Sequence, residues 1–271
     1  MKKKIAVNEI IFAAVLTLSL AALDLTILPA SLFVYIQAAD IEPIYISLII
    51  NQWLLIIIGL IAIRYLCPNL VLGLKITGLK TGLKKYLPSA IIMLAITTFA
   101  YFIGLLGKYD YTPTVWKVLV EIFIYNVSVG FIEELYIRGL LLAILIYLLR
   151  NKKNAVFQAI IISSVMFSLG HIPGMISAGA FAIAMRLIWT FMLGVYLAVI
   201  YKQTDNLWVS IIIHALLNVS GISFCFTTSR EFPQISVIII MIGAVIIALW
   251  SVWDYFKSND KEQKTGFIAQ A

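Results

Sequence analysis

Two adjacent carboxylates and one guanidinium lie within an apolar stretch long enough to cross a bilayer. They are Glu133, Glu134 and Arg138, in the segment Phe-Ile-Glu-Glu-Leu-Tyr-Ile-Arg-Gly that begins at residue 131. A charged side chain at the centre of a membrane helix costs roughly 2.5–3.5 kcal/mol on translocon-type scales. Three such residues close together therefore indicate a functional site, although a buried ion network that only holds helices together would use the same residue types.

Helical geometry predicts different roles for the two carboxylates. Glu134 and Arg138 are four residues apart, so on an α-helix they share a face and can form a charge-assisted pair. Glu133 is rotated by about 100° from its neighbour and can point elsewhere. We therefore predict that Glu134 and Arg138 support the site and that Glu133 is the working carboxylate.

The two histidines of the chain, His171 and His214, fall in other apolar segments. His214 is followed four residues later by Asn218, so the imidazole and the carboxamide face the same way on a helix. Each could serve structure alone, because a membrane-buried His can bond a backbone carbonyl and an Asn can join two helices.

A shared polar pocket would give these residues a chemical role. In such a pocket Glu133 could take a proton from water, while the N–H groups of imidazole and carboxamide stabilise an oxyanion. Two imidazoles and one carboxylate, from His171, His214 and Glu133, would equally make a zinc site with one open position.

The order of the motifs resembles that of the CPBP (CAAX protease and bacteriocin-processing, also called Abi) family of intramembrane proteases. The similarity covers roughly 130–220, within a family-like core of about 114–226, and rests on Glu133-Glu134-x-x-x-Arg138, Phe167-x-x-x-His171 and His214-x-x-x-Asn218. The resemblance implies that Glu133 activates water, that Glu134, Arg138 and Phe167 support the site, and that the catalytic set is completed by His171, His214 and Asn218.

The resemblance implies an intramembrane endopeptidase that hydrolyses a peptide bond at or within the membrane. It leaves open a metal-free glutamate enzyme or a zinc enzyme, so the cofactor is either none or Zn²⁺. We favour the metal-free mechanism because Asn218 beside His214 is typical of an oxyanion donor. The alternative is a non-catalytic bacteriocin-immunity or scaffold protein in which the same polar cluster only serves the structure. A proton-coupled transporter is disfavoured because the sequence lacks repeat symmetry.

Composition predicts the elements that must position these residues. The chain has 271 residues, of which 62% are hydrophobic and 12% charged. Repeated apolar runs of about 20 residues identify an all-α, polytopic helical membrane protein, here with a polar intramembrane cavity. We predict eight spans, at 9–36, 43–64, 88–106, 114–149, 155–172, 179–201, 207–226 and 234–256.

The distribution of Lys and Arg predicts the topology. Fifteen of them fall in alternate segments that would be cytoplasmic, whereas the opposite segments hold only Lys108 and Arg230. The positive-inside rule therefore places both termini in the cytoplasm, and we expect an integral protein of the plasma membrane. The net charge of +7 follows from this bias and does not indicate a nucleic-acid partner. The expected partners are the lipid bilayer and a peptide or membrane-protein substrate.

Three further segments complete the expectations. We predict one membrane domain, 1–256, with a short polar cytoplasmic tail, 257–271. Leucines alternating with lysines over 68–87 favour either an interfacial helix or a basic loop. Thirty-six helical residues over 114–149 would extend about 54 Å, well beyond a hydrocarbon core of about 30 Å, so this helix must tilt, bend or project.

Other charged residues lie within apolar spans without a motif. Lys117 is one turn before Glu121 and is its expected partner. Arg186 could contact a substrate carboxylate, but we favour a buried pair with Asp24 or Glu134.

Overall fold

The computed structural model describes residues 6–25, 43–173, 179–229 and 232–268, and all regular structure in these residues is helical. The helices are α1 (Val7–Leu25), α2 (Pro43–Leu66), α3 (Leu79–Gly104), α4 (Val115–Leu119), η2 (Val120–Tyr125), α5 (Asn126–Glu134), η3 (Leu135–Leu141), α6 (Leu142–Leu149), α7 (Ala155–Leu169), α8 (Ala180–Thr204), α9 (Leu207–Asn218), η5 (Val219–Phe226) and α10 (Gln234–Ile268). The described part of the protein is thus all-α, as predicted.

Within the described residues, five helical segments are long and apolar enough to cross a membrane: Leu48–Leu66, Leu79–Gly104, Ala180–Thr204, Leu207–Phe226 and Gln234–Ser258. Two apolar helical segments are shorter than these five, Val7–Ser19 in α1 and Ala155–Leu169, which is α7. The run from α4 to α6 is continuously helical but contains two π-helical segments, η2 and η3. The predicted number of eight spans is therefore not confirmed, and residues 26–36 of the first predicted span lie outside the described part.

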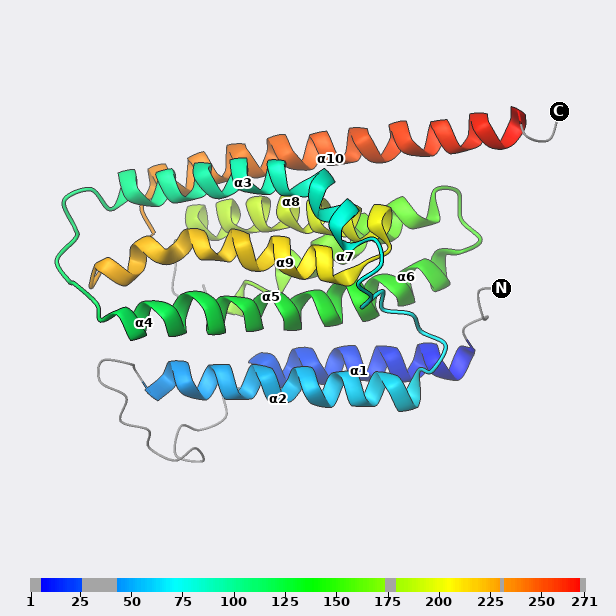
Figure 1. Cartoon of the computed structure of the whole chain (residues 1–271), viewed down its shortest axis with the longest axis horizontal. Helices are drawn as coiled ribbons and strands as arrows, with labels where there is room; N and C mark the ends of the chain where they lie inside the picture. Colours follow the sequence, from blue (N-terminus) through cyan, green and yellow to red (C-terminus); the bar gives the residue numbers. More distant parts are fainter. Residues whose placement is uncertain (1–5, 26–42, 174–178, 230–231, 269–271) are drawn as a thin grey trace.

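Successive helical runs alternate in direction along one bundle (Figure 1). The connections at 67–78, 150–154 and 205–206 lie at the same end of the bundle, where α1 begins and α10 ends. This arrangement agrees with the alternation that the Lys and Arg distribution requires. Which side of the membrane this end faces stays a prediction.

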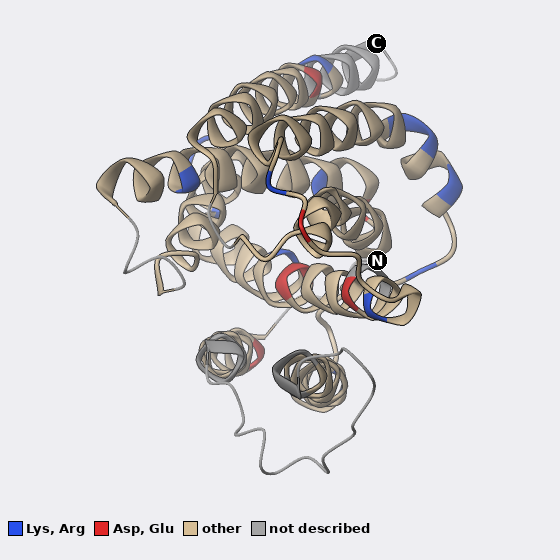
Figure 2. Ribbon diagram, turned by 90° about the vertical axis from the view of Figure 1, so that its left-hand side faces the viewer, with Lys and Arg blue, Asp and Glu red and all other residues tan. Residues whose placement is uncertain are grey.

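Helix α8 lies at the centre of the bundle. It packs against α7, α9 and α10, and its residues from Val195 to Ile200 are all buried. Helix α5 packs between α9 and α2, and Figure 2 shows α1 and α2 as a pair along one side of the other helices. This arrangement surrounds the C-terminal end of α5, where the two adjacent carboxylates lie, with helices from distant parts of the sequence.

Helix boundaries differ from prediction in two places. Residues 67–78 are not helical, because Gly73 and Gly78 adopt positive φ angles of 72° and 82° that a right-handed helix excludes. Helix α3 then begins at Leu79 and passes through Pro88, so the boundary predicted at residue 88 is wrong. At the other end, α10 continues to Ile268, since the lysines and glutamate beyond residue 256 favour helix.

Candidate active site

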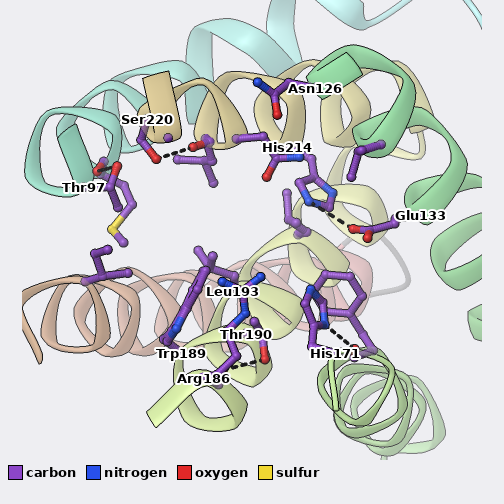
Figure 3. A pocket seen from close by; sticks show the side chains of 18 of the residues that line it. Thr97, Asn126, Glu133, His171, Arg186, Trp189, Thr190, Leu193, His214 and Ser220 are labelled. Carbon is purple, nitrogen blue, oxygen red and sulfur yellow. Dashed lines mark hydrogen bonds and ion pairs between the residues drawn. The ribbon is translucent and has the colours of Figure 1, made fainter. Parts of the chain in front are cut away.

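A cavity of about 470 Å³ opens among α3, α5, α8, α9 and α10. The four residues predicted to be catalytic, Glu133, His171, His214 and Asn218, all line it. Glu133 comes from α5, His171 from the turn after α7, and His214 from α9 (Figure 3). Asn218 is the last residue of α9. The structure thus brings together side chains from three helical runs, although it does not test their roles.

His214 lies between the two adjacent carboxylates. Its Nδ1 is 2.9 Å from Glu134 Oε1 and its Nε2 is 3.4 Å from Glu133 Oε2. On the far side of Glu134, Arg138 Nη1 is 2.8 Å from the same Oε1 atom. One imidazole therefore connects the cavity carboxylate, Glu133, to a completely buried ion pair.

The predicted i,i+4 pair of Glu134 and Arg138 is present, with both side chains at 0% exposure. Sequence reasoning assumed a uniform α-helix, whereas Arg138 lies in the π-helical segment η3 directly after Glu134. Single π-helical turns inside α-helices occur frequently at functional sites. The Arg138 side chain also donates from Nη2 to the carbonyl of Gly194, 3.1 Å away, which joins η3 to α8.

A glycine allows α5 to approach α9 closely enough for these contacts. A Cβ atom at Gly130 would lie 3.0 Å from the backbone nitrogen of Ala215 and 3.2 Å from its Cα. Gly130 precedes Glu133 by three residues, and Ala215 directly follows His214. The small residue thus brings the two carboxylates within reach of the imidazole.

Phe167 packs against the cationic and aromatic groups of the site. The Arg138 guanidinium lies 4.6 Å from the centre of its ring, and the rings of His171 and His214 meet it edge-on at 4.9 and 5.9 Å. The backbone carbonyl of Phe167 accepts a hydrogen bond from His171 Nδ1 at 2.9 Å. Phe167 therefore contacts both imidazoles and the buried arginine.

The hydrogen bond to Phe167 assigns a role to each nitrogen of His171. Because a carbonyl only accepts, Nδ1 carries the proton in this contact. In the neutral ring Nε2 then carries a lone pair and can accept a hydrogen bond. His171 can therefore orient a water molecule at the cavity.

The possible zinc ligands do not form a metal-type cluster. Across the described ranges, no three His, Cys, Asp or Glu side chains are grouped as metal ligands would be. In the set proposed from the sequence, His214 has both ring nitrogens facing carboxylates. We therefore derive no reaction step through a metal.

Several cavity residues were not among the predicted catalytic and supporting residues. Arg186 lines the cavity on α8 beside Trp189, whose ring centre lies 4.4 Å from the guanidinium carbon. The expected pairing of Arg186 with Glu134 is wrong, since no such ion pair occurs among the described side chains, and the side chain of Asp24 lies outside them. Asn126 also lines the cavity, two helical turns before Glu133, and this spacing of seven residues could have identified it.

The predicted pair of Lys117 and Glu121 is present, with 3.9 Å between Nζ and Oε1. Glu121 also accepts a hydrogen bond from the thiol of Cys225 at 2.9 Å. Neither acid nor base is among the residues that line the cavity. This ion pair thus lies on the same helical run as Glu133 but apart from the candidate site.

Comparison with known proteins agrees with the motifs. Residues 114–220 match the family model described as type II CAAX prenyl endopeptidase Rce1-like. The match contains all seven residues of the three motifs. No curated protein matches the chain.

Proposed function

Because the segment 114–220 belongs to the Rce1-like family of CAAX proteases, we propose that this intramembrane protease fold hydrolyses a peptide bond in the cavity by a water molecule that Glu133 activates. The observation that carries the proposal is the chain of contacts from Glu133 through His214 to the buried pair of Glu134 and Arg138. A carboxylate that faces a cavity and is supported in this way has the arrangement of a general base.

The attacking water lies between Glu133 and His171 in this mechanism. Glu133 takes one proton, and the lone pair on His171 Nε2 accepts the second O–H as a hydrogen bond. The hydroxide adds to the carbonyl carbon of the peptide bond. General-base catalysis of this kind accelerates a reaction by about 10²- to 10⁴-fold.

The remaining residues act on the tetrahedral intermediate and the leaving group. The carboxamide N–H of Asn218 donates to the oxyanion, where a fixed donor in a site with little water is most effective. His214 donates from Nδ1 to Glu134, so its Nε2 faces Glu133 and can receive the proton taken from water. The C–N bond breaks when this proton passes to the leaving amine, giving one new carboxyl group and one new amine.

The surroundings support a membrane-associated peptide or protein substrate. The cavity lies within apolar helices, so a substrate must enter from the bilayer or its surface. We propose that the Lys-rich connections face the cytoplasm, which places both termini there, and that the protein resides in the plasma membrane.

The test uses the full chain in proteoliposomes with a pool of peptides that each carry an apolar segment. Cleavage in ¹⁸O-labelled water, followed by mass spectrometry, identifies the new carboxyl group by its label. Glu133→Gln should reduce cleavage at least about 100-fold, the lower end of the range for a general base. Glu121→Gln is the matched control, because it removes a membrane carboxylate from the same helical run but not from the cavity.

Two outcomes would contradict the proposal. Equal cleavage by the wild type and a folded Glu133→Gln variant would exclude this base. If the wild type cleaves no peptide, and both it and Glu133→Gln protect cells from a bacteriocin, the non-catalytic immunity function is favoured.

A further inference from the structure

The proposed mechanism does not use Arg186, the other arginine at the cavity. Its side chain rises from α8, opposite the wall from which His214 projects (Figure 3). The Nε atom is buried and has no hydrogen-bond acceptor among the described residues. A buried polar group without a partner costs free energy, so an anion that binds to it from the cavity would recover that loss.

Aromatic side chains surround the Arg186 guanidinium. The guanidinium stacks on Trp189 at 4.4 Å and lies 5.9 Å from the ring centre of Phe232. Both aromatic side chains and Tyr101 belong to the cavity wall. Stacking covers the flat face of a guanidinium but not the N–H groups at its edge, which match the two oxygens of a carboxylate.

The charges around Arg186 differ from those around Arg138. Glu133 and Tyr101 are within electrostatic range of the guanidinium. Arg138, by contrast, has its own carboxylate at 2.8 Å and is completely buried. An anion bound at Arg186 would therefore leave intact the buried pair that supports the candidate base.

We propose that Arg186 is a specificity-determining residue that binds a carboxylate of the substrate in the cavity. The inference rests on the proposed function, since it assigns the substrate of the same site. The carboxylate comes either from the end of the peptide chain or from an Asp or Glu side chain near the cleaved bond. Either source would fix the position of the peptide bond relative to Glu133.

The experiment uses three versions of the same peptide pool with the full chain in proteoliposomes. One version has free carboxyl termini, the second has amidated termini, and the third has free termini but Asn and Gln in place of every Asp and Glu. Loss of the relevant carboxylate should lower kcat/KM about 10- to 100-fold, the range expected for a charged hydrogen bond. The version that is cleaved poorly identifies the source of the carboxylate.

Variants of Arg186 then test the assignment. Arg186→Gln should lower cleavage of the preferred version to the level of the neutral one, mainly through KM, and so remove the preference. Arg186→Lys should restore part of it, since an ammonium keeps the charge but not the planar fork. Arg150→Gln is the control for loss of one arginine, because Arg150 stacks on Tyr147 outside the cavity and should leave the preference unchanged.

Binding of fluorescently labelled pools to the same proteoliposomes separates this inference from the proposed function. A carboxylate preference in binding that depends on Arg186 supports the inference even where no peptide is cleaved. A loss of cleavage in the Glu133→Gln variant does not affect this binding measurement on the wild type and the Arg186 variants. Equal weakening of all three versions by Arg186→Gln, or equal binding of all three by the wild type, would show that Arg186 only stabilises the fold.

Discussion

The ion pair of Glu134 and Arg138 makes a quantitative prediction about stability. Both side chains are completely buried and their charged atoms are 2.8 Å apart. Beyond Glu134, the guanidinium contacts the carbonyl of Gly194 and the ring of Phe167. Arg138→Met therefore leaves the Glu134 carboxylate buried with only His214 to compensate its charge.

Removing one member of a buried pair costs about 3–5 kcal/mol, because the other charge stays out of water without its partner. We expect this loss for Arg138→Met and a similar one for Glu134→Gln. The double variant leaves neither charge uncompensated, so it should cost no more than either single change. The resulting coupling free energy is about 3 kcal/mol, at the upper end of values for contacting residues.

The coupling is measured by a double-mutant cycle on reversible unfolding in mixed detergent micelles. Lys117→Met and Glu121→Gln form the matched cycle, since that pair is also i,i+4 on the same helical run but has its charged atoms 3.9 Å apart and is partly exposed. Its coupling should be at most about 1 kcal/mol. A coupling for Glu134 and Arg138 no larger than that of the control would refute the claim that the buried pair supports the site.

Two further predictions concern packing and pH. Gly130→Ala should lower cleavage at least about tenfold, because the added Cβ, 3.0 Å from the Ala215 nitrogen, must push α5 away from α9, and overpacking typically costs about 1–3 kcal/mol. Gly179→Ala is the control, because nothing lies within 4 Å of a Cβ atom added there. Unchanged cleavage by Gly130→Ala would contradict the role of this close approach. Asp110 accepts hydrogen bonds from the backbone N–H and hydroxyl of Thr228, which lower the pKa of its carboxyl group. Because the pKa of Asp110 is lower in the folded protein than in the unfolded chain, its carboxylate stabilises the fold at pH values above the unfolded pKa, and this stabilisation is lost as the pH falls through the folded pKa. Asp110→Asn should therefore flatten the acid limb of a plot of unfolding free energy against pH. An unchanged acid limb would mean that this contact does not contribute to stability.

Local regularities made part of the site predictable from sequence. The long apolar runs identified a helical membrane protein, because a bilayer core excludes unpaired backbone groups. The spacing of Glu134 and Arg138 predicted their pair, since residues four apart are neighbours on one helix. The order of the three motifs predicted the family, which the match over residues 114–220 confirms.

Local periodicity could not predict how the helices face one another. Hydropathy does not distinguish the lipid-facing side of a membrane helix from its packed side, because lipid tails are as apolar as leucine. The contact of His214 with both carboxylates depends on the close approach at Gly130, which no pattern within one helix reveals. The pairing predicted between Arg186 and Glu134 was wrong for the same reason.

Residue type and helical spacing are properties of one segment, so they were sufficient to predict which residues could do chemistry and that membrane helices would carry them. That Glu133, His171, His214 and Asn218 line one cavity, and that Arg186 shares it, became known from the packing of the helices. Those positions depend on the crossing and register of separate helices. Small residues such as Gly130 set this register through contacts between segments far apart in the chain.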